Sequence, residues 1–399
     1  MQSATTIDSP ATVTAAKTSV HIPALTGVRF FAVFHIFLFH LWSVYNGDKA
    51  EGFENLMIGF ASMPQGLVSF LSNGFLSTPF FFMLSGFILS YLYWGKEGQL
   101  TISRKQFWLS RLFRLYPIHL IVIVPTILLM FYNHLQNGFS GLEVAASAVA
   151  SITLTQAWYA PWVPMWSWPT WTISALVFLY LVMPWLMHVL GKLTQTQSVI
   201  LLMALPIISM VPTAIYAWLT QGMVDVDIVW AIVIGSTPLF WVPHFIAGML
   251  LTRIFAISRF NSDWRPAEPS WFAWGDVALL GLIVYACMGT IAEPLKFFIR
   301  HGLFMPLYMQ IILDFARGNG IFARIFSLPG MQFLGELSFS IFIWQNIVMI
   351  FCWISLMINP ATGHYHILGA SVVIVLLSIL STYKIEKPLA NKLQRKYLS

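Results

Sequence analysis

The stretch RFFAVFHIFLFH, residues 29–40, places one arginine and two histidines in a segment otherwise built of Phe, Ile, Leu, Val and Ala. A segment this apolar suits the hydrocarbon core of a bilayer, where a charged side chain is costly unless it faces protein or a water-filled cavity. The whole chain has the same character, because 58% of its 399 residues are hydrophobic and only 9% are charged. A soluble fold of this size could not bury so much apolar surface. The sequence therefore predicts an all-α, polytopic membrane helix bundle.

The rest of the chain supplies further membrane-spanning segments, each of which needs about 20 mostly apolar residues. Eleven candidates satisfy this requirement: 24–45, 67–95, 114–133, 142–158, 170–190, 197–219, 227–251, 272–292, 297–316, 330–357 and 366–385. The segment 142–158 is short and interrupted by Ser and Thr, so we interpret it as a re-entrant or interfacial helix. About ten transmembrane helices remain.

The positions of the basic residues support this count. They cluster after the second, seventh and ninth candidates and at the C-terminus: Lys96, Arg104, Lys105, Arg111 and Arg114; Arg253, Arg259 and Arg265; Arg317 and Arg324; Lys384, Lys387, Lys392, Arg395 and Lys396. If all four clusters are cytoplasmic, an even number of crossings must separate them, so one of the intervening candidates does not cross. The Trp/Pro-rich run 157–171 and the acidic stretch 223–227 then face outward, and both termini are cytoplasmic.

We expect three regions along the chain. Residues 1–21 are polar, lack the apolar core of a secretory signal peptide and are predicted to form a disordered cytoplasmic tail. Residues 22–388 form the transmembrane domain, and residues 389–399 form a basic cytoplasmic tail. Cys287 and Cys352 lie far apart in apolar runs, so no disulfide framework is expected. We expect no metal site and no nucleic-acid partner.

Arg29 and His40 share one face of the first predicted helix. They are eleven residues apart, which at 100° per residue is three turns plus about 20°, and they lie about 16 Å apart along the axis. We expect this face to line a cavity that opens towards the cytoplasm. The alternative is that Arg29 extends to the membrane interface and His40 and His35 pack within the protein.

A second basic motif is RLFRLYP, residues 111–117. Arg111 and Arg114 are three residues apart and so are adjacent on a helix surface. Paired guanidinium groups can bind phosphate in a bidentate manner. The alternative is that the two arginines only anchor the topology or contact anionic lipid.

Six motifs together resemble acyltransferase family 3, in that family's order and approximate spacing. They are ALTGVRFFAVFHIFLFH, FFFMLSGFILS, RLFRLYP, WTISALVFLYLVMP (171–184), PHFIAGMLL (243–251) and LGELSFSIFIWQ (334–345). The resemblance extends over about residues 22 to 388. The family comprises membrane O-acyltransferases with ten crossings that modify bacterial surface glycans and some secondary metabolites.

The resemblance implies a function and a set of site residues. It implies transfer of an acyl group, most simply acetyl, from cytoplasmic acetyl-CoA to a sugar hydroxyl of an exopolysaccharide, O-antigen or lipid-linked oligosaccharide at the bacterial inner membrane. Arg29 and His40 match the family's Arg-x10-His motif, and Arg111 and Arg114 match its Arg-x-x-Arg motif. Histidine titrates near neutrality, so we expect His40 to act as general base or as a briefly acylated nucleophile. Arg29 would orient it, contact the donor or stabilise the oxyanion, and Arg111 and Arg114 would bind the CoA phosphates.

The sequence also departs from the family pattern. The family's acidic residue after WTIS is replaced by Leu176, and its closing histidine is replaced by Gln345. These changes affect groups that would position the acceptor. Further candidate substrate-binding residues are His35, Ser85, Trp171, Ser174 and Gln345.

Two other functions remain open at this stage. An acyltransferase acting on a small-molecule secondary metabolite would carry the same motifs. A transporter or proton relay would also place Arg and His deep in a helix bundle. Against a transporter, no inverted repeat is detectable, and Asp276, Asp314 and Glu336 lie near the ends of the predicted crossings.

Overall fold

The computed structural model describes residues 21–47, 63–95, 98–221, 228–260, 270–289, 295–359 and 363–397. The predicted N-terminal tail up to residue 20, Lys96, Arg265 and the acidic stretch 223–227 lie outside the described residues.

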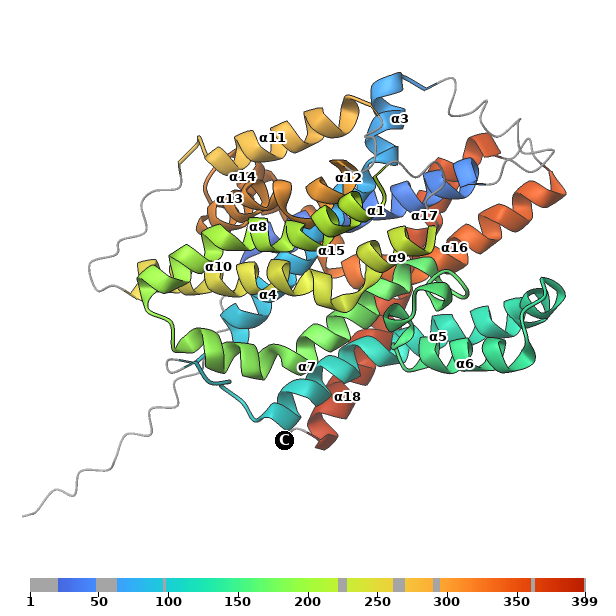
Figure 1. The fold of residues 1–399 in the computed structure, drawn as a ribbon, viewed down its shortest axis with the longest axis horizontal. Helices are drawn as coiled ribbons and strands as arrows, with labels where there is room; N and C mark the ends of the chain where they lie inside the picture. Colours follow the sequence, from blue (N-terminus) through green and yellow to red (C-terminus); the bar gives the residue numbers. More distant parts are fainter. Residues whose placement is uncertain are drawn as a thin grey trace, which may run out of the picture.

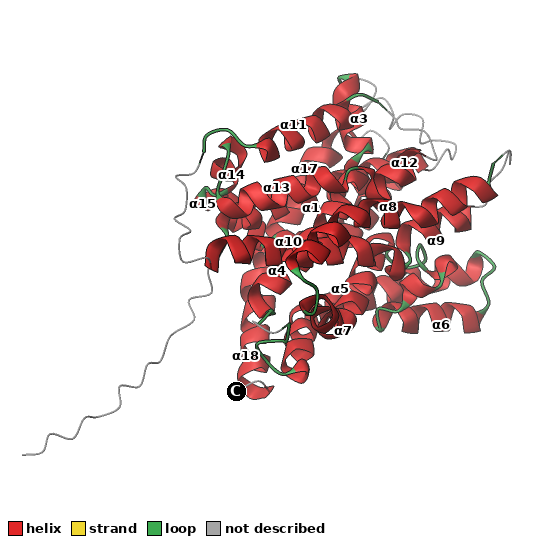
Figure 2. Ribbon diagram, turned by 60° about the vertical axis from the view of Figure 1, so that its left-hand side comes forward, coloured by secondary structure: helices red, strands yellow, loops and turns green. Residues whose placement is uncertain are grey.

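The described part of the chain is helical, with one isolated β-bridge between Trp94 and Leu100 (Figures 1 and 2). The first half contains α1 (Pro23–Gly47), α3 (Gln65–Ser72), η1 (Gly74–Leu76), α4 (Ser77–Tyr93), α5 (Arg104–Gln136), α6 (Gly141–Ile152), the 3-10 turns η2 (Gln156–Trp158), η3 (Ala160–Trp162) and η4 (Trp168–Thr170), α7 (Trp171–Gly191) and α8 (Gln195–Leu219). The second half contains α9 (Ile228–Ser236), η5 (Pro238–Trp241), α10 (Val242–Phe260), α11 (Trp274–Cys287), α12 (Leu295–Phe298), the π-turn η6 (Ile299–Leu303), α13 (Met305–Arg317), α14 (Ile321–Phe326), α15 (Pro329–Glu336), α16 (Ser338–Ile358), α17 (Gly363–Ser381), the π-turn η8 (Thr382–Glu386) and α18 (Lys387–Tyr397). The prediction of an all-α membrane bundle is confirmed.

Eight helical stretches among the described residues are long and apolar enough to cross a bilayer. They correspond to eight of the ten predicted crossings. The other two, 272–292 and 297–316, appear as the shorter helices α11 and α13, which pack against each other. The total of ten crossings stays a prediction.

Helix α6 occupies the segment that the sequence sets apart from the crossings. It has 12 residues, which at 1.5 Å per residue extend about 18 Å, well short of a hydrocarbon core of about 30 Å. It packs on the 33-residue α5, and the two helices form a hairpin at the side of the bundle (Figure 1). A helix of this length does not cross the membrane alone, as expected for 142–158.

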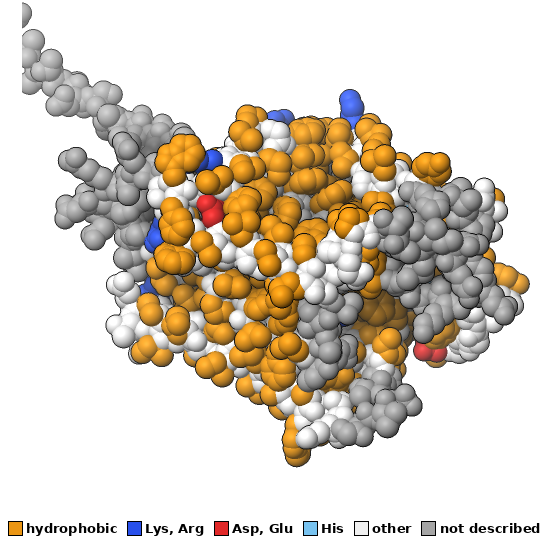
Figure 3. Space-filling view, turned by 90° about the horizontal axis from the view of Figure 1, so that it is seen from above, with side chains coloured by type: hydrophobic (Ala, Val, Ile, Leu, Met, Phe, Trp, Pro, Cys, Tyr) orange, Lys and Arg blue, Asp and Glu red, His pale blue; other side chains and the backbone are white. Residues whose placement is uncertain are grey.

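The outer surface is largely apolar. Figure 3 shows one face on which hydrophobic side chains cover most of the described surface and charged groups are few. Examples on α5, α8 and α17 that are each at least 67% exposed are Leu128, Leu129, Met203, Ile207, Trp218 and Leu368. Apolar side chains this exposed are expected where a helix faces lipid tails.

Helices α4 and α10 approach each other closely, and glycines permit it. A Cβ atom added to Gly86 would lie 2.2 Å from the Phe245 carbonyl oxygen, and one added to Gly248 would lie 1.9 Å from the Met83 carbonyl oxygen. Small residues at such a crossing let two backbones pack directly in a membrane bundle. This packing fixes the position of α4, which contributes residues to all three cavities described below.

Three carboxylates near the ends of predicted crossings have structural partners. Asp276 accepts hydrogen bonds from the backbone N–H of Ile321 (2.6 Å) and of Phe322 (3.2 Å) at the start of α14, and Asp314 accepts one from Gly275 N (2.8 Å) at the start of α11. Glu336 pairs with Lys387 at 2.6 Å, and the hydrogen bond from that ammonium lowers the pKa of its carboxyl. These partners explain why acidic residues stand at the ends of the predicted crossings.

Candidate active site

Three arginines that the sequence singles out line one cavity. Arg29 of α1 and Arg111 and Arg114 of α5 surround a space of about 750 Å³, together with Ser85 and Leu92 of α4, Tyr180 of α7 and Ser338 of α16. We call this space the arginine cavity. Arg114 is exposed and Arg29 and Arg111 are half-buried, so the cavity opens at the start of α5.

The guanidinium groups of this cavity are held mainly by uncharged partners. Arg111 donates to the Tyr93 hydroxyl at 2.8 Å and lies over that ring, and Arg29 makes a long contact with the Thr26 hydroxyl at 3.4 Å. No carboxylate among the described residues forms an ion pair with any of the three. Three positive charges without a paired anion suit a ligand that carries several phosphate charges.

His40 lines a different cavity of about 1000 Å³, which we call the histidine cavity. Aromatic and cationic side chains surround it, including Phe39 of α1, Trp168 of η4, Trp171 of α7, Lys296 of α12 and Arg300 of η6. The hydroxyl-bearing residues Thr78, Thr172 and Ser236 also line it. Aromatic faces and hydroxyls are the contacts that a sugar or another polar acceptor would use.

Gln345 of α16 orients the His40 ring. Its Oε1 atom lies 3.1 Å from His40 Nδ1. With the Gln345 amide in this orientation its oxygen accepts, so Nδ1 carries the proton and donates, and Nε2 keeps its lone pair. His40 is therefore in the tautomer that a general base at Nε2 requires. The Gln345 Nε2 atom is buried and has no partner among the described residues.

The single continuous cavity expected along α1 is replaced by two neighbouring cavities that share no lining residue. The rings of Phe81 and Phe342 stack at a centroid distance of 6.1 Å, and Phe81 lines the arginine cavity whereas Phe342 lines the histidine cavity. Arg29 and His40 share a helix face, as predicted, but they line different cavities. Arg29 is therefore grouped with Arg111 and Arg114 rather than with His40.

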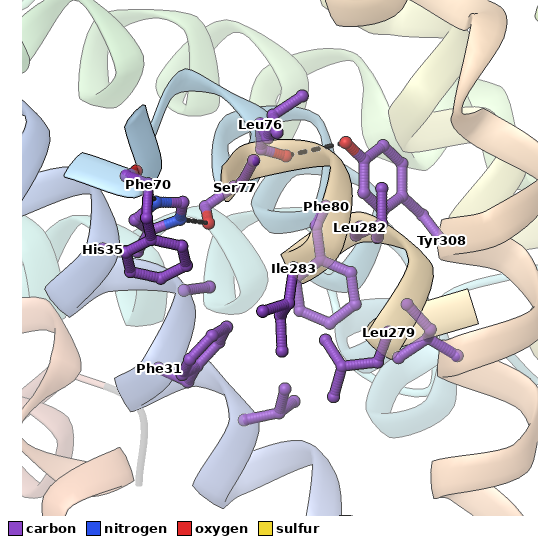
Figure 4. A pocket seen from close by; sticks show the side chains of 14 residues that line it. Phe31, His35, Phe70, Leu76, Ser77, Phe80, Leu279, Leu282, Ile283 and Tyr308 are labelled. Atoms are coloured by element: carbon purple, nitrogen blue, oxygen red, sulfur yellow. Dashed lines mark hydrogen bonds between the residues drawn. The ribbon is translucent and has the colours of Figure 1, made fainter. Parts of the chain in front are cut away.

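His35 lies apart from both cavities. Its Nδ1 is 2.9 Å from the Ser77 hydroxyl, its Nε2 is 2.8 Å from the Phe70 carbonyl oxygen, and its ring stacks on Phe70 (Figure 4). It borders a third cavity of about 480 Å³, which Figure 4 shows to be walled mainly by apolar side chains. Both ring nitrogens are thus occupied by structural partners, which matches the packing alternative for this residue.

The remaining candidate residues fall in three different places. Trp171 is buried in the histidine cavity, and Ser85 lines the arginine cavity while it donates to the Phe81 carbonyl oxygen at 2.8 Å. Ser174 is 1% exposed, and its buried hydroxyl has no partner among the described residues. It lines none of the three cavities.

Arg300 is a further residue of the histidine cavity, which none of the sequence motifs singled out. This arginine belongs to the predicted crossing 297–316 and lines the histidine cavity with His40. Like Arg29, Arg300 is a charged residue within an apolar segment, and this signal was available in the sequence. What the sequence did not indicate was that the two residues face different cavities.

Comparison with known proteins gives one family match. The family described as "Acyltransferase domain" matches residues 22–383, which is nearly the whole chain. No solved structure matches this chain.

Three curated proteins are similar to this chain. The acyltransferase MdmB of Streptomyces mycarofaciens is 26% identical over 41% of this chain and 39% of its own length. The peptidoglycan O-acetyltransferase OatA of Listeria monocytogenes is 21% identical over 82% of this chain and 49% of its own length. The putative peptidoglycan O-acetyltransferase YrhL of Bacillus subtilis is 21% identical over 94% of this chain and 56% of its own length. The chain thus spans about half the length of the relatives that it matches.

Proposed function

The chain belongs to the acyltransferase-domain family, and on that premise we propose that it is a membrane O-acetyltransferase that uses acetyl-CoA to acetylate a glycan hydroxyl. The observation that carries the proposal is the pair of neighbouring cavities, one lined by three arginines and the other by His40 held in the tautomer of a general base. The first suits a polyanionic donor and the second suits proton abstraction from a hydroxyl.

In this proposal the donor enters from the cytoplasmic side. Arg29, Arg111 and Arg114 bind the phosphates of CoA, and the slender pantetheine arm extends from the arginine cavity past Phe81 and Phe342 towards His40. The stacked pair would have to separate to admit the arm. The thioester is already activated, so the enzyme needs chiefly a base for the hydroxyl and a polarised carbonyl.

The acceptor occupies the histidine cavity. His40 Nε2 removes the hydroxyl proton as the oxygen attacks the thioester carbon, and the same proton then passes to the departing thiolate. Two of the three relatives are named as peptidoglycan O-acetyltransferases, and they match more of this chain than the third does. This similarity favours a glycan acceptor over a small secondary metabolite.

The reaction can be tested directly. Purified protein in lipid nanodiscs is expected to transfer label from acetyl-CoA to glycan fragments, giving products that lose the label in mild alkali as esters do. Mass spectrometry of surface glycans from cells with and without the gene should show acetyl esters only in the former. The glycan assignment would be contradicted if the surface glycans were unchanged and no tested glycan fragment received label. If a small molecule received the label in the same assay, that molecule would be the acceptor.

Replacing Gln345 should impair the orientation of His40, and so kcat, without impairing donor binding. Gln345→Leu removes the carbonyl that fixes the tautomer, so kcat should fall about tenfold, a part of the 10²–10⁴ that a general base supplies. The KM for acetyl-CoA should be nearly unchanged, because Gln345 does not line the arginine cavity.

A matched variant is Gln345→His, which restores the residue that the family commonly has and can again accept from Nδ1. Its kcat should exceed that of Gln345→Leu. Parental kcat in the leucine variant would show that Gln345 only packs against His40.

A further inference from the structure

Arg300 is held rigidly at the wall of the histidine cavity. Its guanidinium carbon lies 5.3 Å from the ring centroid of Trp171 and 5.3 Å from that of Trp241. Nη2 donates to the Gly235 carbonyl oxygen at 2.9 Å, and a Cβ atom at position 235 would lie 2.9 Å from Nη1. Two aromatic faces and one carbonyl thus fix the cation, because cation–π contacts and a hydrogen bond restrict a planar group from several sides.

This fixed cation has no opposite charge beside it. No carboxylate among the described residues forms an ion pair with Arg300, and its buried Nε–H has no partner among them. A guanidinium has five N–H donors, and the described contacts use one. A charge held in the protein interior without a counter-ion is costly. Such a charge is usually retained because it binds an anion.

The position of Arg300 relative to His40 suggests which anion Arg300 binds. Both side chains line the histidine cavity, and the guanidinium is close enough to interact electrostatically with the imidazole. When a hydroxyl attacks a thioester, negative charge develops on the carbonyl oxygen, and a preorganised donor near that oxygen stabilises the transition state. In the structure Arg29 lines the arginine cavity and does not line the histidine cavity, so it is less suited to this role than Arg300.

We propose that Arg300 is the catalytic cation that stabilises the oxyanion of the acyl-transfer intermediate formed beside His40. The inference rests on the proposed acetyl-transfer function and adds a residue to it.

The chemical step is balanced with the groups already named. The hydroxyl oxygen bonds to the thioester carbon, its proton moves to His40 Nε2, and the carbonyl π electrons become the oxyanion that Arg300 binds. The oxyanion then reforms the carbonyl, the C–S bond breaks, and the thiolate of CoA takes the proton back from His40. No oxidant, metal or further reactant is required.

The test uses full-length protein in nanodiscs with labelled acetyl-CoA and an acceptor that the parental protein acetylates. Arg300→Ala should lower kcat by about a hundredfold to a thousandfold, the usual loss when one oxyanion donor is removed, with little change in either KM. Arg300→Lys should recover part of the rate, because an ammonium restores the charge without the planar fork. Added methylguanidinium should partly restore kcat in Arg300→Ala by occupying the vacated space.

Two control variants distinguish a catalytic role of Arg300 from a structural one. Arg253→Ala removes another partly buried arginine, which donates to the Leu190 carbonyl oxygen at 2.7 Å and lies outside all three cavities. Its activity per folded molecule should stay near parental and should not respond to methylguanidinium. His40→Ala should not respond to methylguanidinium either.

Three outcomes would overturn the inference. Parental kcat in Arg300→Ala would remove Arg300 from catalysis. A rise confined to the KM of the acceptor would show that Arg300 recognises an anionic group of the acceptor instead. A loss of kcat that neither lysine nor methylguanidinium repairs would indicate a structural role. If the parental protein itself transfers no label, the proposed function fails, which is a separate result.

Discussion

Replacing His40 with alanine is expected to lower kcat for acetyl transfer by about a hundredfold to ten thousandfold, the contribution of a positioned general base. The reason is geometric: the imidazole lines the histidine cavity, and Gln345 holds its Nδ1–H so that Nε2 is free to accept a proton. If His40 were instead acylated as a nucleophile, the loss would be at least as large. The measurement is single-turnover transfer of label from acetyl-CoA by purified protein in nanodiscs.

His35→Ala is the matched control for this experiment, because it removes a histidine from the same helix. His35 satisfies the Ser77 hydroxyl and the Phe70 carbonyl oxygen, so its loss should destabilise the fold by about 1–3 kcal/mol as those buried groups lose their partners. Activity per folded molecule should stay near parental. Parental activity in His40→Ala, or equal losses per folded molecule in both variants, would disprove the catalytic assignment of His40.

Replacing Arg111 and Arg114 together with alanine is expected to raise the KM for acetyl-CoA about a hundredfold or more while leaving the KM for the acceptor nearly unchanged. A hydrogen bond to a charged group contributes about 1.5–3 kcal/mol, and about 1.4 kcal/mol corresponds to a tenfold change in affinity. Both arginines line the arginine cavity, which shares no residue with the histidine cavity. The two KM values are measured separately by varying one substrate at saturating levels of the other.

Two comparisons sharpen this prediction. Acetyl-pantetheine carries the thioester but none of the CoA phosphates, so the double variant should handle it as the parental protein does. Arg104→Ala with Lys105→Ala removes the same number of charges from the start of α5 without touching the cavity, and should change neither KM. The arginines serve topology rather than donor binding if both double variants lose the same share of activity. The same conclusion follows if the KM for the acceptor rises as much as the KM for acetyl-CoA in the Arg111 and Arg114 variant.

Much of the candidate site was predictable because its signals are local. Arg29 and His40 are conspicuous because they interrupt an apolar segment, and Arg111 with Arg114 because they are three residues apart on one helix face. Gln345 was visible as a departure from the family pattern, although its contact with His40 was not. The contact joins residues 305 positions apart, a separation at which neither helical period nor composition carries information.

Other features could not be read from the sequence because side-chain volume decides them. The turn of 100° per residue places Arg29 and His40 on one face of α1. It does not show that Phe81 and Phe342 stack on each other or that Arg29 and His40 line different cavities. His35 and His40 look alike in the sequence, and only their partners distinguish them. Ser77 and Phe70 occupy both nitrogens of His35, whereas the Nε2 of His40 has no partner among the described residues.

The sequence by itself determined that this chain is a helical membrane bundle, because apolar length and the placement of basic residues are additive properties of short segments. It also determined the family, because six local motifs stand in the family's order. Only the tertiary structure decided which helix faces meet. Helix α1 packs against α4 and α16, its residues Arg29 and His40 line separate cavities, and the π-turn before α13 places Arg300 in the cavity of His40. Such contacts depend on how large side chains from distant segments fill a shared space, and no local pattern encodes that.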